Sequence, residues 1–203
     1  MTHSQRAATT DDDAKAAVVA ATVAWLEAAV IGLDLCPFAG AVHAEKRIRY
    51  AVTAAETPEA LLEALMAELR TLAAADPGEI ETTLLIHPRV FGDFLDYNDF
   101  LDVADAALDE LSLAGEIQIA SFHPRYQFAG TAPEDIGNFS NRSPYPMLHL
   151  LREASVERAI AAHPDTAQIP EKNLETLRRL GRKGWDRLMH KLLRPFRQNK
   201  GCH

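Results

Sequence analysis

The sequence predicts an α/β fold: a single domain with a small, mostly parallel sheet of three or four strands, flanked by helices and followed by a basic C-terminal helical segment. Three observations predict it. Helix-period and strand-period segments alternate along 203 residues, of which 47% are hydrophobic. Short connections separate most of these segments. The tripeptide His-Pro-Arg occurs at 87–89 and at 123–125, and each copy ends an apolar run typical of a buried strand.

The individual elements follow from apolar spacing, which repeats every three to four residues in helices and every two in half-buried strands. Residues 1–13 are polar and rich in Asp, which predicts an unstructured terminus. The helix beginning at Pro58 has the clearest start, because Thr57 is a good N-cap and proline fits the first helical position. In chain order the predicted elements are helix 14–32, strand 47–53, helix 58–75, strand 82–86, a helix ending near 113, strand 117–122, helix 146–162, a short strand at 166–169, and one or two basic helices from 170 onward.

We expect one domain, with residues 14–170 forming the α/β body and residues 171–203 forming a basic helical extension packed on it. The extension holds ten Lys/Arg against three Asp/Glu, whereas residues 1–170 hold eleven against twenty-six. Such a basic end can bind an anionic partner or fold back on the acidic body. We favour the second interpretation.

Composition also predicts the compartment. No apolar run approaches the roughly 20 residues of a membrane span, and the N-terminus lacks the apolar core of a secretory signal. The two cysteines, Cys36 and Cys202, argue against a disulfide framework. We therefore expect a cytoplasmic protein without a membrane span, in which Cys36 is a free thiol. A homo-oligomer is compatible with this composition.

The two His-Pro-Arg copies predict a site. Proline disfavours a helix at the residue before it, so His87 and His123 should stand at the carboxyl ends of neighbouring parallel strands, where α/β proteins bind ligands. Strands about 4.8 Å apart can aim two imidazoles at one metal ion. The structural alternative is that both rings only hydrogen-bond to loop carbonyls.

Further metal ligands must come from other segments. His149 and Glu153 are four residues apart on the helix predicted there and would share one face. The remaining candidates are carboxylates, namely Asp93, Asp96, Glu134 and Asp135. Two histidines with one carboxylate suit non-haem iron, whereas His149 or Cys36 as a further ligand would suit zinc.

The long polar connection of residues 124–145 predicts a substrate-binding region, because a loop of this length in a compact domain is more often functional than accidental. Arginine forks donate paired hydrogen bonds to carboxylates or phosphates. The predicted substrate-binding residues are Arg89, Arg125, Gln127, Asn141 and Arg142. Tyr126 and Glu134 are candidates for moving protons. Alternatively, the polar side chains of this loop bind one another.

Cys36 suggests a different chemistry, as a nucleophile with His123 as its base. It follows a predicted helix C-terminus, whose dipole raises rather than lowers a thiol pKa. A free cysteine is also a common small core residue. Nucleotide cofactors and serine hydrolysis are poor candidates, because the sequence contains no P-loop, Gly-rich dinucleotide fingerprint or Gly-x-Ser-x-Gly elbow.

Long motifs occur at Leu35–Ala39, at Phe94–Phe100 and, above all, at Ile117–Arg158. In these segments, and over about residues 15–185, the chain resembles a bacterial family, the domain of unknown function fourteen-fifteen. The family name implies no established activity. The resemblance therefore implies membership and leaves function to the chemistry of the residues.

Together these residues predict a metal-dependent enzyme, using non-haem iron or zinc, that acts on a small anionic molecule at the carboxyl edge of the strands. The predicted metal ligands are His87, His123, His149 and Glu153. Two alternatives stay open: a thiol-dependent enzyme using Cys36 and His123, and a noncatalytic module that binds a ligand or partner. Nucleic acid is not an expected partner.

Overall fold

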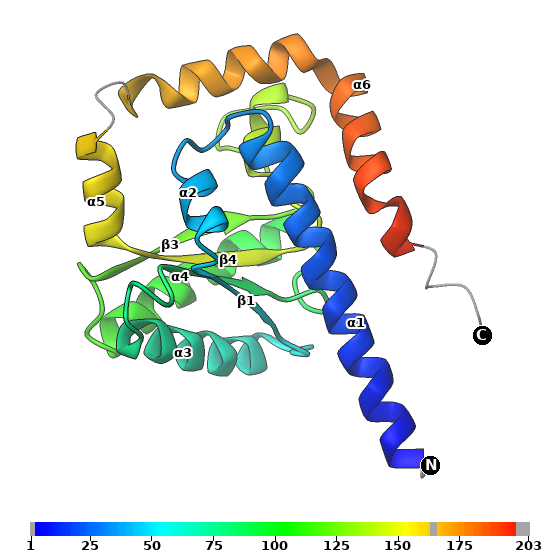
Figure 1. Ribbon diagram of the computed structural model, residues 1–203, viewed down its shortest axis with the longest axis vertical. Helices are drawn as coiled ribbons and strands as arrows, with labels where there is room; N and C mark the ends of the chain where they lie inside the picture. The colour runs from blue at the N-terminus through cyan, green and yellow to red at the C-terminus, as the bar shows by residue number, and fades with distance from the viewer. Residues whose placement is uncertain (1–2, 163–165, 198–203) are drawn as a thin grey trace.

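The structure is a computed structural model that describes residues 3–162 and 166–197 (Figure 1). The described residues form one four-stranded sheet in the order β1-β2-β4-β3. Its strands are β1 (Ile48–Val52), β2 (Thr82–Ile86), β3 (Ile117–Phe122) and β4 (Met147–Arg152). Helices lie on both faces of this sheet, which confirms the predicted α/β fold with a small flanked sheet.

The direction of the strands differs from the prediction. β1 and β2 are parallel, whereas β4 lies between β2 and β3 and is antiparallel to both. The expectation of a mostly parallel sheet was therefore wrong. The reason is β4, in a segment predicted as part of helix 146–162: Met147, Leu148 and Leu150 are buried, as in a central strand with both faces covered. Helix α5 (Glu153–Ala162) begins only after it.

One face of the sheet is covered by α3 (Pro58–Ala74) and α4 (Phe94–Glu110). The Thr57 hydroxyl accepts a hydrogen bond from the Ala60 amide at 3.3 Å, which confirms the predicted cap. The apolar stripe of α3 is fully buried and consists of Leu61, Leu65, Leu69 and Leu72. It packs in one cluster with Leu85 and Leu150 from the sheet, so this side is a continuous core.

The opposite face is covered by α1 (His3–Trp25), the π-helix η1 (Leu26–Ile31), the short α2 (Ala39–Ala44), the 3-10 helix η2 (Ile136–Asn141) and α6 (Ile169–Arg197). Figure 1 shows α3 and α6 on opposite sides of the sheet. Trp25, Phe139 and Trp185 centre the core on this second side.

Two predictions about the ends of the chain were also wrong. α1 starts at His3, inside the region predicted to lack structure, because extending an existing helix costs little once its nucleus has formed. The short strand predicted at 166–169 is instead the 3-10 turn η3 (Thr166–Gln168) leading into α6, since Pro170 is tolerated in a first helical turn. Cys202 lies outside the described residues.

Two features of the long helices affect later arguments. α6 is kinked at Gly181, whose φ of 67° and ψ of 165° are not helical, so its halves point in different directions. The segment Asp11–Ile31 has the length and apolar composition of a membrane span, and 33% of its apolar window is buried here. The expectation that no apolar run approaches this length was therefore wrong. Core helices share this composition, and the cytoplasmic location stays a prediction.

Candidate functional site

His87 and His123 lie at the same edge of the sheet, because β2 and β3 are both antiparallel to β4. The His87 amide donates to the Pro146 carbonyl at 3.1 Å, and the His123 amide donates to the Asn141 carbonyl at 3.2 Å. β4 separates the two strands, so two strand spacings of about 4.8 Å lie between them instead of the single spacing expected.

Tyr97 on α4 contacts both imidazoles. Its ring stacks on them, with centroids 5.7 Å from His87 and 5.2 Å from His123. Its hydroxyl donates to the Met147 carbonyl at 2.8 Å and accepts from the Phe122 amide at 3.2 Å. All three aromatic side chains are buried. Sequence reasoning missed Tyr97, although its helical spacing from the apolar residues of α4 was an available signal.

The imidazoles hold the connection between β2 and α4. The Nε2–H of His123 donates to the Phe91 carbonyl at 3.1 Å, while its Nδ1 accepts the Arg125 amide at 3.0 Å. The Nδ1–H of His87 donates to the Val90 carbonyl at 3.2 Å. The two rings therefore bind consecutive carbonyls. The His87 Nε2 is buried and has no hydrogen-bond partner among the described residues.

Burial controls the charge of these rings. It lowers the pKa of His87 to about 4, with a smaller contribution from the neighbouring His123, and it also lowers the pKa of His123. Both imidazoles are therefore neutral at pH 7. Neutral imidazole is the form that binds a metal, but both ring nitrogens of His123 already have partners. One buried lone pair, on His87, is left free.

The other two predicted metal ligands lie elsewhere. His149 is on β4 with its side chain on the α1 and α6 side of the sheet, where its Nε2–H donates to the Thr82 hydroxyl at 2.7 Å. Glu153 begins α5, after the far end of β4. The proposed helical pairing of these two residues was wrong because the segment is a strand. Within residues 3–162 and 166–197, no group of three or more His, Cys, Asp or Glu is placed to hold a metal ion.

The predicted arginine clamp is not assembled. Arg89 lies near Asp11 and Glu56, at 3.4 Å from each carboxylate, beside a small pocket of about 80 Å³. Arg125 donates to the Gly92 carbonyl and to Asp93 at the start of α4. These two guanidinium groups are bound to separate segments, so they do not converge on one anion.

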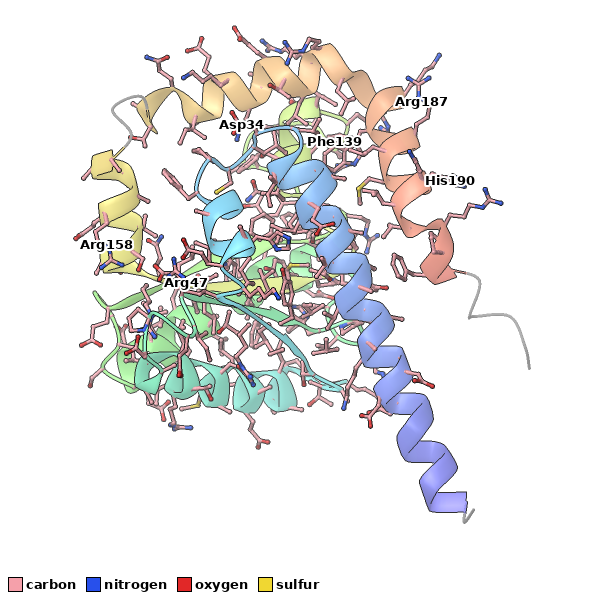
Figure 2. The ribbon with its side chains drawn as sticks, in the orientation of Figure 1. Asp34, Arg47, Phe139, Arg158, Arg187 and His190 are labelled. Carbon is pink, nitrogen blue, oxygen red and sulfur yellow. The ribbon has the colours of Figure 1, made fainter. Side chains whose placement is uncertain are left out.

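Arg142 has a structural position. It donates to the Tyr126 carbonyl at 3.3 Å and to the Pro133 carbonyl at 2.6 Å, and its guanidinium carbon lies 4.2 Å from the centre of the Phe139 ring. Phe139 in turn packs edge-on against Trp185 on α6, and Figure 2 shows it where η2 meets α1 and α6. Arg142 therefore fixes the 124–145 connection to the body.

The remaining polar candidates are bound within the connection or to α6. Gln127 donates to the Thr131 carbonyl at 2.6 Å, and the Tyr126 hydroxyl lies 3.4 Å from that of Ser121. Glu134 forms an ion pair with Arg182. Of the carboxylates considered as metal ligands, Asp93 and Asp135 cap α4 and η2, and Asp96 is exposed. The alternative of a loop held by its own side chains describes these contacts.

A cavity of about 440 Å³ lies on the opposite side of the sheet from the imidazoles. Three segments form its wall: the end of η1 with the turn after it, the end of β3 with the connection after it, and the first half of α6. Its lining residues are Val30, Leu35, Cys36, Phe122, Phe128, Gly137, Ser140, Asn141, Ile169, Pro170, Asn173, Leu174 and Leu177. The wall is mainly apolar, with amide, hydroxyl and thiol groups at a few points.

Cys36 is a free thiol, as predicted, and it lies in this wall. It is the one residue with an ionisable side chain among the described lining residues. His123 does not line the cavity: it packs against Phe94 and Tyr97 on the α4 side, while the preceding Phe122 faces the cavity. Alternation along β3 thus directs the proposed base away from the thiol. The Cys36 and His123 pair is not assembled.

The sequence pointed to some of the residues that line the cavity, but not to all of them. Cys36, Asn141 and the long 124–145 connection were singled out, and all contribute to the wall. The contribution of α6 was missed, because Ile169, Leu174 and Leu177 have the spacing of any core-facing helix. Nothing in that spacing distinguishes a residue that lines a cavity from one that fills a core.

Comparison with known proteins gives one match. No curated protein and no solved structure matches the chain. The family described as "Protein of unknown function (DUF1415)" matches residues 17–187, which include all four strands and the whole lining of the cavity. This match confirms the resemblance noted in the sequence, and the chain belongs to that family.

Proposed function

We propose that this protein binds a small, uncharged and largely apolar molecule in the cavity beside Cys36. The observation that carries the proposal is the cavity itself. Its volume of about 440 Å³ falls within the range of small-molecule sites, and its wall combines aromatic and aliphatic side chains with a few polar groups. Of the alternatives that the sequence left open, this favours a ligand-binding module.

The polar groups of the wall would orient the ligand. Asn173 donates to the Leu35 carbonyl at 2.9 Å, so its side chain is fixed against the turn that carries Cys36. Asn141 is fixed in the same way, by donating to the Ser121 carbonyl at 3.2 Å and accepting from Ser140 at 2.9 Å. Preorganised amides of this kind favour a ligand with one polar end.

The charge of the wall supports an uncharged ligand. No Lys, Arg or His is among the described lining residues, so an anion would lose its hydration without gaining a cationic partner. The arginines expected to bind an anion are engaged by other groups. The proposal therefore replaces the small anionic substrate with a neutral molecule.

The test uses N-phenyl-1-naphthylamine, a neutral apolar dye whose fluorescence rises on leaving water. A Leu174→Trp variant fills the cavity and should weaken dye binding by about tenfold or more, which corresponds to about 1.4 kcal/mol. Leu192→Trp is the matched control, because Leu192 is on the same helix but outside the wall. Equal binding by both variants would remove the proposal.

A second readout uses the thiol. In a Cys202→Ser background Cys36 is the single cysteine, so its reaction with a colorimetric disulfide reagent reports access to the wall. Saturating dye should slow this reaction in the wild-type cavity and leave it unchanged in Leu174→Trp. If bound dye does not protect the thiol, the dye binds elsewhere.

Metal-dependent catalysis at the histidine edge, the edge of the sheet where His87 and His123 lie, is a second proposal, and one observation favours it. The buried His87 Nε2 has a free lone pair and no described partner. Elemental analysis of untagged protein purified without chelator tests it, with the His87→Ala, His123→Ala double variant as comparison. Near-stoichiometric iron or zinc that disappears in the folded variant would support a metal centre, and equal metal content in both would exclude one there.

A further inference from the structure

The second half of α6 carries a basic ridge that none of the above uses. Lys183, Arg187, Lys191 and Arg194 are spaced four, four and three residues apart, so they lie along one side of the helix, and all four are exposed. Figure 2 shows Arg187 and the nearby His190 on the outer side of α6, away from α1. The described part of the chain gives none of the four an ion-pair partner.

This ridge does not fold back on the acidic body. In the described part of this half of the helix, the carboxylate contacts are made by the neighbouring Arg182, which pairs with Glu134 and Asp186. The favoured interpretation of a basic end neutralised by the body is therefore not realised along the ridge. An exposed, unpaired row of cations is suited to a surface with a high density of negative charge.

Apolar side chains accompany the ridge. Leu188 and Met189 pack against the core, but Leu192, Leu193 and Phe196 are half-exposed and belong to neither core cluster of the described residues. The neighbouring α1 likewise has Val19 and Val23 half-exposed and outside both clusters. The helix end thus combines a cationic side with an incompletely covered apolar side.

We propose that residues 182–196 of α6 dock this protein on an anionic lipid surface. A helix with Lys and Arg on its polar side and Leu and Phe on the other is the pattern of a segment that lies in a membrane interface. Nucleic acid fits less well, because the phosphate backbone uses the cations but leaves Leu192, Leu193 and Phe196 without a role. Docking here is independent of the cavity, which is bounded by the first half of α6.

The kink at Gly181 separates these two roles. The half before it, beginning at Ile169, closes the cavity and is anchored by the fully buried Leu177. Trp185 anchors the start of the half after it, and beyond Met189 the helix continues with side chains that are exposed or half-exposed. Residues 190–196 can therefore contact a surface without opening the core.

The experiment is flotation of the full chain with vesicles of phosphatidylcholine alone or with 30% phosphatidylglycerol. We expect binding to the anionic vesicles that declines as salt screens the charges, and no binding to phosphatidylcholine alone. Lys191→Glu with Arg194→Glu should lower the partition coefficient by about tenfold or more, since each basic residue near such a surface contributes a severalfold effect.

Arg178→Glu with Arg179→Glu is the matched control, because it changes the net charge equally on the exposed side of the first half of α6. It should bind like the wild type. A Leu192→Ser, Leu193→Ser variant, checked for its native circular dichroism, should also bind more weakly. Equal losses in the two charge variants, or a labelled oligonucleotide bound in place of anionic vesicles, would overturn the proposal.

Discussion

The two faces of the sheet use their residues in opposite ways. The α3 and α4 face holds His87, Tyr97 and His123, the side chains with the most evident chemistry, and it is packed closed around them. The α1 and α6 face holds a cavity of about 440 Å³ whose described wall has one ionisable side chain. The side chains with reactive groups are thus used in packing and hydrogen bonding, whereas mainly uncharged side chains line the space that a ligand can occupy.

Acid should have the largest effect, and it acts on both faces. Burial lowers the pKa of His87 to about 4 on one face and that of His149 to about 4 on the other. An unfolded histidine titrates near 6.5, so between these values the unfolded chain binds more protons and the free energy of unfolding falls as pH falls. The loss approaches about 3 kcal/mol for each residue by pH 4.

Urea denaturation at pH 7, 5.5 and 4.5 measures this dependence. The His87→Leu and His149→Leu variants should each flatten the slope between pH 6.5 and 4, and the double variant should flatten it further. An unchanged slope in the double variant would show that other groups cause the acid sensitivity.

Shortening a leucine should lower the free energy of unfolding more on the packed α3 and α4 face than beside the cavity. Leu65 is fully buried on α3, so Leu65→Ala should lower the free energy of unfolding by about 2–5 kcal/mol. Leu174 already borders empty space, so Leu174→Ala should cost less than about 1 kcal/mol. Chemical denaturation of both variants gives the comparison. Equal costs would mean that the cavity collapses in solution.

Removing the Tyr97 hydroxyl tests how much its two hydrogen bonds stabilise the histidine edge. Tyr97→Phe leaves the Met147 carbonyl and the Phe122 amide without their buried partner, and should cost about 1–3 kcal/mol. Tyr126→Phe is the control, because the Tyr126 side chain is half-exposed, and it should change stability by less than about 0.5 kcal/mol. Thermal unfolding, monitored by circular dichroism, measures both variants. Equal shifts in melting temperature would contradict this prediction.

The smallest effect is expected outside both faces. The Arg89 side chain is 50% exposed and lies 3.4 Å from two exposed carboxylates, so Arg89→Ala should change the free energy of unfolding by about 0.5 kcal/mol or less. Dye binding should also stay at the wild-type level. A large loss of stability or of dye binding would make Arg89 a candidate functional residue again.

The parts of the fold that were predictable depend on local signals. The Thr57 cap with Pro58, the apolar strand at 82–86 and the X-Pro bonds after both histidines each determine conformation within a few residues. The segment from Met147 to Arg152 has no such signal, because its apolar residues do not alternate and suit a helix as well as a buried strand. That one ambiguity changed the sheet from parallel to mixed.

The site shows the same limit at longer range. The sequence correctly predicted that His87 and His123 reach one edge of the sheet, and it left open that both rings bind loop carbonyls. It did not identify the partners as Val90, Phe91 and Arg125. Those partners depend on where the chain returns after each strand. Likewise, Cys36 and Asn173 line one cavity because Asn173 donates to the carbonyl of Leu35, 138 positions away, and no local pattern encodes that contact.

The position of β4 has a consequence for how the chain acquires its fold during synthesis. β4 is the last strand to be made, yet it occupies the middle of the sheet and pairs with β2 and β3 on either side. Until residue 152 leaves the ribosome, the facing edges of β2 and β3 have unpaired backbone groups, and the Tyr97 hydroxyl lacks its Met147 acceptor. The sheet is therefore completed late, and a nascent chain that stops before β4 offers two open edges to which chaperones or other chains can bind.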